Sequence, residues 1–229
     1  MIANIDELSF DELKGTVTTG HPPLHENALA IFELIGQLRP KTVHEVGCGG
    51  GDHLGNGLTL FPDIIFSGGD RSETQLALLR KRHPQLLNRV ILQDLTMPFS
   101  NKWPQVELVY SQAVLMHIHT AVSHFVAFAN MINQSTKYVV LMENYQCHNF
   151  VEEAKALFAG GHTNWPKMNI YRFFGSHGAR IILLSQEDLN YPTLSSDAQI
   201  RDGLKTSKRR LKRGQEDFDR ASFGKSVEN

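Results

Sequence analysis

Glycines and an acid gather at one point of the sequence, directly after a short apolar run. Residues 43–51 read Val-His-Glu-Val-Gly-Cys-Gly-Gly-Gly, so Glu45 precedes a G-x-G-x-G pattern formed by Gly47, Gly49 and Gly51. Glycine is needed where a ligand must approach the backbone closely or where φ is positive. A loop of this kind between a first strand and its helix is the place where doubly wound sheets bind nucleotides.

The spacing of these glycines discriminates between possible ligands. A dinucleotide fingerprint, G-x-G-x-x-G, that begins at Gly47 would need glycine at position 52, where the chain has Asp52. A phosphate-binding P-loop would need a lysine after its second glycine, and the loop contains none. With no lysine or arginine and an acid on either side, the loop favours a ligand that carries a sulfonium or amino group.

Strand and helix patterns alternate along the chain and would position this loop. Apolar residues at helical spacing predict helices over residues 27–38 and around 122–132, and Ser72 is placed to cap a helix that ends at Arg82. Because the links are short, the alternation predicts a parallel sheet with helices on both faces. The predicted strands cover residues 42–46, 64–66, 89–92, 107–110 and 138–142.

Two later strands break this alternation. Residues 169–174 and 180–184 are separated only by Gly-Ser-His-Gly, and so short a turn predicts an antiparallel hairpin. The predicted fold class is therefore α/β, a doubly wound, mostly parallel seven-stranded sheet with a C-terminal antiparallel hairpin and helices on both faces. Apolar periodicity fades after about residue 185. The predicted divisions are an N-terminal segment that could form a lid (1–26), a ligand-binding domain (27–188) and a charged C-terminal extension (189–229).

Four segments in order resemble the motifs of the class I methyltransferases that use S-adenosylmethionine. The loop at residues 45–51 is similar to their first motif, and residues 69–72 (Gly-Asp-Arg-Ser) resemble the second. Residues 94–95 (Asp-Leu) and 110–118 resemble the third motif and the segment at the end of the fourth strand. The resemblance covers about residues 27–185, and it implies that the domain binds S-adenosyl-L-methionine and releases S-adenosyl-L-homocysteine.

The resemblance also implies roles for single residues. Glu45 would lie near the amino group of the cofactor, Asp70 would accept the ribose hydroxyls, and Asp94 would accept the adenine amine. Other readings stay open, because the glycine turn could be only a tight loop, Asp70 a helix cap and Asp94 a turn former. The cofactor-binding residues so implied are Glu45, Gly47, Cys48, Gly49, Gly51, Asp70, Arg71, Asp94, Leu95 and Ser111.

The residues that would bind the methyl acceptor are harder to identify from the sequence, because methyl transfer from a sulfonium needs mainly positioning and sometimes a base. His117 follows the fourth predicted strand and is the candidate catalytic base, with capping or packing as the alternative. His148 and His162 are weaker candidates that fit solvated loops. The polar residues 143–149 could bind substrate, and Trp165 could stack on a planar acceptor or cover the core.

Composition narrows the class of protein. The two cysteines, Cys48 and Cys147, form no disulfide framework, and the scattered histidines show no metal-ligand spacing, so no metal is predicted. No apolar run approaches the ~20 residues that span a bilayer, and the acidic N-terminal stretch does not resemble a signal peptide. A soluble, cytoplasmic protein is expected, and its oligomeric state is left open.

The formal net charge of −1 hides an uneven distribution. Residues 205–213 hold six basic groups and no acid, which leaves 17 basic and 24 acidic groups on the other 220 residues. The acidic body favours a small-molecule methyl acceptor, modified at oxygen or nitrogen. The alternatives are an RNA-directed methyltransferase whose basic segment holds phosphates, and a cofactor-binding partner without catalysis.

Overall fold

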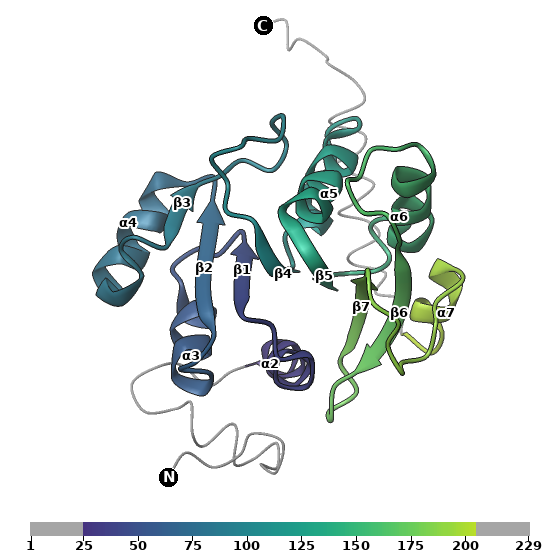
Figure 1. Cartoon of the computed structure of the whole chain (residues 1–229), viewed down its shortest axis with the longest axis horizontal. Coiled ribbons are helices and arrows are strands. Elements are labelled where there is room, and N and C mark those ends of the chain that lie inside the picture. The colour runs from purple at the N-terminus through teal and green to yellow at the C-terminus, as the bar shows by residue number, and fades with distance from the viewer. Residues whose placement is uncertain (1–24, 205–229) are drawn as a thin grey trace, which may run out of the picture.

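Seven strands form one sheet in the computed structural model, which describes residues 25–204 (Figure 1). The strands are β1 (Thr42–Val46), β2 (Ile65–Asp70), β3 (Val90–Leu92), β4 (Val106–Gln112), β5 (Ser135–Met142), β6 (Asn169–Phe174) and β7 (Arg180–Ser185). The helices are α2 (Glu26–Leu38), α3 (Asp52–Leu60), α4 (Glu73–Arg82), α5 (Ser123–Gln134), α6 (Phe150–Ala159) and α7 (Asp197–Arg201), with short 3-10 turns at Pro84–Leu86 (η2) and Leu115–His117 (η3).

The strand order is β3-β2-β1-β4-β5-β7-β6. Strands β1 to β5 run parallel, whereas β7 is antiparallel to both β5 and β6. This order confirms the predicted seven-stranded sheet with a terminal hairpin. The chain reverses its direction of travel across the sheet between β1 and β4, and such a switch point opens a crevice at the carboxyl ends of the strands.

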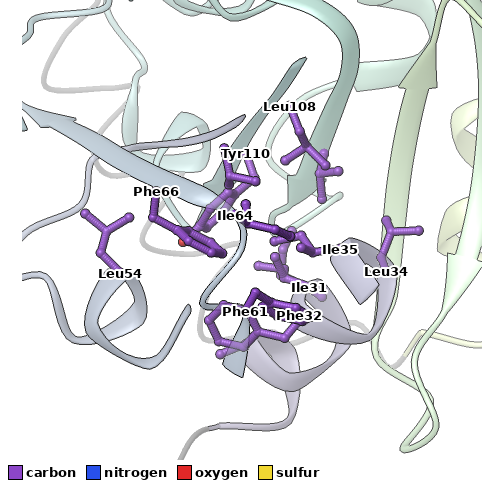
Figure 2. Close-up of a cluster of buried hydrophobic side chains, with 14 of the residues drawn as sticks. Ile31, Phe32, Leu34, Ile35, Leu54, Phe61, Ile64, Phe66, Leu108 and Tyr110 are labelled. Atoms are coloured by element: carbon purple, nitrogen blue, oxygen red, sulfur yellow. The ribbon is translucent and has the colours of Figure 1, made fainter. Parts of the chain in front are cut away.

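Two apolar layers hold the helices against the sheet. On one face, α2 and α3 pack their side chains around Phe66 and Tyr110 of the strands (Figure 2). On the other face, α5 and α6 contribute Phe128 and Phe150 to a second buried cluster. Because both faces are covered, the central strand β5 has a continuous apolar run from Tyr138 to Met142.

Helix α4 follows the predicted capping pattern. The Ser72 hydroxyl accepts a hydrogen bond from the Gln75 N–H at 3.3 Å, and the helix ends at Arg82. Helix α6, which the sequence analysis did not identify, is held by a more distant residue. Its Val151 and Glu152 amides each donate to the Asp197 carboxylate at 3.1 Å, which satisfies two of the open donors at the helix start.

Strand β2 corrects one predicted boundary. The sequence predicted a strand over residues 64–66, but the strand continues through Ser67, Gly68 and Gly69 to Asp70. Gly68 and Gly69 both lie inside this strand, and other side chains pack closely against them. A Cβ on Gly69 would lie 2.0 Å from Gln93 Oε1, and one on Gly68 would lie 2.6 Å from Leu54 Cδ1. Here glycine serves close side-chain packing inside the strand.

The predicted division at residues 188/189 stays a prediction, although part of the chain beyond it packs on the sheet. Leu194 and Ile200 are buried in the second apolar cluster, and Thr193 forms a bridge with Tyr171. The predicted lid and the basic run at 205–213 fall outside the described residues, apart from the end of the lid segment at residues 25–26. Among the described helices, none has both the length and the hydrophobicity needed to cross a bilayer.

Gly51→Ala is expected to lower the free energy of unfolding by about 1–3 kcal/mol more than Gly178→Ala does. The two glycines have similar φ values, 80° and 79°, so both variants carry the left-handed backbone cost of about 1 kcal/mol. Only at Gly51 would the new Cβ overlap a neighbour, since it would lie 2.4 Å from Leu79 Cγ. Urea denaturation of both variants measures the difference, and equal losses would show that this packing is not tight.

Candidate functional site

A cavity of about 230 Å³ lies where β1, β2, β3 and β4 end. Its lining comes from four loops that are far apart in the sequence and that meet because these strands are parallel. The lining residues are Gly47, Asp70, Arg71, Gln93, Asp94, Leu95, Thr96, Ala113, Val114, His117 and Ile118. The cavity thus brings together Gly47, Asp70, Arg71, Asp94, Leu95 and His117 of the predicted site, while Glu45, Cys48, Gly49, Gly51 and Ser111 lie around it.

The glycine loop after β1 adopts a backbone that other residues rarely accept. Gly47 and Gly49 have φ values of 67° and 50°. A Cβ on Gly47 would lie 2.5 Å from Val114 Cγ2, so the loop after β1 packs directly on the loop after β4. At Gly49, by contrast, the nearest atom to an added Cβ is Gln75 Oε1 at 3.9 Å, so the loop remains approachable there.

Asp70 connects the glycine loop to the start of α4. Its Oδ2 accepts the Gly49 N–H at 2.9 Å, and its Oδ1 accepts the Ser72 N–H at 2.8 Å. A carboxylate offers about four acceptor positions, so each oxygen of Asp70 retains capacity for a ligand hydroxyl. The structural role that was left open for Asp70 is therefore present, and it leaves room for the predicted ligand contact.

Asp94 forms a local turn with Thr96. Its Oδ1 accepts both the Thr96 N–H at 3.0 Å and the Thr96 hydroxyl at 2.7 Å. The loop is fixed from α5, where the Asn130 side-chain amide donates to the Leu95 and Met97 carbonyls at 2.8 Å each. Since both Thr96 bonds fall on one oxygen of Asp94, the other oxygen can face a ligand.

Glu45 is buried beneath the glycine loop and does not line the cavity. Its Oε1 lies 3.0 Å from His53 Nδ1 of α3, and the Tyr110 hydroxyl also lies close to the carboxylate. Burial by itself would lower the pKa of His53, but the Glu45 carboxylate raises this pKa above its usual value. Burial raises the pKa of the Cys48 thiol, with Glu45 adding to the effect, so the thiol stays protonated and unreactive.

The Glu143 carboxylate, at the end of β5, holds the loop that follows β4. Its Oε1 accepts the Ser111 hydroxyl at 2.7 Å and the Val114 and Leu115 amides at 3.1 and 3.2 Å, and its Oε2 accepts the Met116 amide at 3.1 Å. Burial raises the pKa of Glu143, and these four donors oppose the rise. The sequence analysis placed Glu143 in a substrate-binding segment, but its side chain turns inward to fix the backbone.

The loop held by Glu143 carries His117 to the edge of the cavity. Ala113 begins the loop with a φ of 54°, an uncommon conformation for a residue with a Cβ, and its N–H donates to the Met142 carbonyl at 2.9 Å. His117 ends η3 and is exposed. Strained backbone of this kind persists where surrounding contacts impose it, and it is common at functional sites.

Gln93 is a lining residue that the sequence analysis missed. It lies behind the cavity in a buried polar chain, with its Oε1 2.9 Å from His44 Nε2 and its side-chain amide donating to Gln134 Oε1 at 2.9 Å. Burial lowers the pKa of His44 to about 4, so the imidazole is neutral at pH 7. This chain joins α5 to β1 across the sheet, and no sequence spacing signals it.

The remaining predicted side chains lie elsewhere. Trp165 is buried, and its indole N–H donates to the Ser135 carbonyl at 2.7 Å, so it covers the core and cannot stack on a ligand. His162 lies exposed in a loop, as expected. Asn144 and Gln146 of the polar segment after β5 line a second cavity of about 250 Å³.

Comparison with known proteins gives a match of fold. No model of a protein family matches the chain, and no curated protein matches it in sequence. In contrast, 789 chains of solved structures match it in fold.

Three of these structures illustrate the likeness. The amino pentose methyltransferase CalS10 from Micromonospora echinaspora, solved with SAM bound, has a TM-score of 0.56 and 16% identity, over 71% of this chain and 91% of its own. The methyltransferase domain of bacterial CtHen1 has a TM-score of 0.54 and 11% identity, over 70% of this chain and 97% of its own. DesVI from Streptomyces venezuelae has a TM-score of 0.53 and 15% identity, over 70% of this chain and 91% of its own.

Glu143→Gln is expected to loosen the loop after β4. A glutamine keeps one acceptor oxygen, but its amide group would meet the Met116 N–H, so that two donors face each other. Hydrogen exchange of the amides at 114–116 should become about tenfold faster, which equals about 1.4 kcal/mol of local opening free energy. The matched control is Glu152→Gln, whose exposed side chain contacts Lys155 on the surface of α6 and should leave exchange at 114–116 unchanged. Unchanged exchange in the Glu143 variant would contradict the anchoring role.

Proposed function

We propose that this chain, whose fold is that of the class I methyltransferases that use S-adenosylmethionine, binds this cofactor and transfers its methyl group to an oxygen or nitrogen of a small-molecule acceptor. The observation that carries the proposal is the cavity at the switch point of the sheet. There the backbone of Gly47, two carboxylates and one histidine come from the ends of four successive parallel strands. A solved structure of similar fold is an amino pentose methyltransferase with SAM bound, which supports both the cofactor and the class of acceptor.

The residues around the cavity fit S-adenosylmethionine. Gly47 and Gly49 adopt positive φ and carry no side chains, so a ligand can lie against the backbone there. Asp70 and Asp94 outnumber the single arginine of the lining, Arg71, and give the cavity a negative character that suits a sulfonium. Glu45, 3.0 Å from His53 Nδ1, adds a third carboxylate close to the loop.

Each group has a separate task in holding the cofactor. Asp70 would accept the two ribose hydroxyls with the acceptor positions that Gly49 and Ser72 leave open. Asp94 would accept from the adenine amine with the oxygen that Thr96 does not use, and the Leu95 amide would lie next to the ring. Ser111 would act through Glu143, by fixing the loop that closes the cavity.

The chemical step needs little beyond position and a base. When bound, S-adenosylmethionine supplies a methyl group already activated on a sulfonium, and its product is S-adenosylhomocysteine. His117, on the edge of the cavity, would act as the general base that takes the proton from the acceptor hydroxyl or amine. The Glu143 anchor keeps the loop of His117 in one position, which lowers the entropic cost of aligning base and acceptor.

Asp70→Ala is expected to weaken the binding of S-adenosylhomocysteine by about 1–3 kcal/mol, because a charged acceptor of hydrogen bonds is lost. Isothermal titration calorimetry measures the change. Because Asp70 also holds the glycine loop, Asp94→Ala is a second test that leaves this loop intact. The control is Asp63→Ala, which changes an exposed residue and should leave the affinity unchanged. If the wild-type chain binds neither S-adenosylmethionine nor S-adenosylhomocysteine at millimolar concentration, the proposed function fails.

His117→Ala is expected to lower turnover by about 10²–10⁴, the usual contribution of a general base, without weakening cofactor binding. The assay supplies S-adenosylmethionine and a pool of small metabolites and measures the S-adenosylhomocysteine that forms. His162→Ala is the matched control, since His162 is exposed in a loop outside the cavity lining. A normal rate in the His117 variant would remove His117 as the base and leave the cofactor site untouched.

A further inference from the structure

A second cluster of titratable side chains lies behind the loop of His117. It consists of His124 in the first turn of α5, and of His148 and Glu153 around the start of α6. One ligand atom of each residue lies within 4.8 Å of those of the other two. His124 Nε2 is 3.4 Å from Glu153 Oε1, and the rings of His124 and His148 are stacked with centroids 4.3 Å apart.

The hydrogen bonds in the described part of the chain leave this cluster incompletely satisfied. Glu153 is 9% exposed, and its Oε1 accepts only a long bond from the Asn149 N–H at 3.2 Å. Glu153 Oε2 is buried without a partner in that part of the chain, whereas the Ala121 backbone carbonyl lies within reach of the His124 imidazole. Buried polar atoms without partners are costly, so an arrangement that retains them calls for a ligand.

We propose that His124, His148 and Glu153 form a binding site for a divalent transition-metal ion such as Zn²⁺. Two imidazoles and one carboxylate are a ligand set that Zn²⁺ accepts, with a fourth position left for water or another group. Two ligands of a tetrahedral ion at metal–ligand distances of about 2.0–2.1 Å lie about 3.3 Å apart, close to the 3.4 Å between His124 Nε2 and Glu153 Oε1. The rings of His124 and His148 are stacked with their planes 14° apart, so the rings would have to turn before nitrogens of both could bind one ion.

The surroundings of His148 resemble those of a metal ligand. A ligating histidine commonly donates its other ring N–H to a backbone carbonyl, which orients the ring. His148 Nε2 lies 3.1 Å from the Leu115 carbonyl, and the Ile118 carbonyl also lies beside this imidazole. His119, whose ring centroid is 5.5 Å from that of His148, is a candidate for the fourth position.

Charged groups of both signs lie near Glu153. Burial raises the pKa of Glu153 to about 7, and the Asp197 carboxylate adds to this rise, whereas the Asn149 amide and the Arg201 guanidinium lower the pKa. The Arg201 guanidinium donates a hydrogen bond to the His148 carbonyl at 2.7 Å and not to Glu153.

A metal in this place would join three parts of the fold. It would tie the starts of α5 and α6 to each other and, through His148 and the Leu115 carbonyl, to the loop that carries His117. The site is separate from the lining of the cofactor cavity, so the inference does not depend on the proposed function. It departs from the prediction of no metal, because the three residues are far apart in the sequence and only the fold brings them together.

The test is metal binding by the full chain without a polyhistidine tag, after treatment with a chelator. Zn²⁺ is titrated in competition with a chromophoric chelator, and Co²⁺ is used as a probe whose visible absorption reports the geometry of its ligands. The wild-type chain should bind one ion with a Kd in the micromolar range or tighter. His124→Ala and Glu153→Gln should weaken binding at least tenfold, and His162→Ala should bind like the wild type.

Two outcomes would overturn the proposal. One is no binding by the wild-type chain, and the other is equal binding by the wild type and by both cluster variants, which would indicate adventitious surface sites. Glu153→Gln preserves the size of the side chain and an acceptor for the Asn149 amide, so it carries the test if His124→Ala fails to fold. Since no cofactor is added, a chain that binds Zn²⁺ but no S-adenosylhomocysteine would contradict only the proposed function, and the reverse result would contradict only the metal site.

Discussion

The buried carboxylate of Glu143 is the interaction on which the arrangement of the site depends. It lies at the end of β5 and binds the Ser111 hydroxyl and three successive amides of the loop after β4. A carboxylate placed in a protein interior costs free energy unless its acceptor positions are used, and here four donors use them. The same bonds hold backbone that would otherwise relax, including Ala113 with its positive φ.

Consequences of this anchor extend in two directions. Toward the switch point, the fixed loop places Val114 against Gly47 and His117 at the edge of the cavity. The part of the cavity lining that follows β4 therefore depends on Glu143, which follows β5. Away from it, the Leu115 carbonyl meets His148 and connects the loop to α6. A single buried acid thus couples the cavity to the histidine cluster behind it, and both inherit their geometry from the register of β4 with β5.

Local patterns predicted most of the scaffold because short-range physics specifies it. The strand at 42–46, the cap at Ser72 and the hairpin turn at 175–178 are each decided by neighbouring residues, and the structure confirms them. The predicted end of the second strand was wrong, because glycines that usually mark a turn here make room for Gln93 and Leu54. Trp165 could not be placed from sequence, since covering the core and stacking on a ligand require the same apolar ring.

The sequence by itself determined the fold class and the edge of the sheet at which the site lies, because glycine spacing and strand–helix alternation are properties of the chain read in order. Tertiary structure alone decided what the isolated polar residues do. Glu143 lies 29 residues from the Val114 amide that it binds, and His124 lies 29 residues from Glu153, so no local pattern links either pair. Their partners are set by which strands and helices pack side by side, and that depends on the burial of apolar surface over the whole domain.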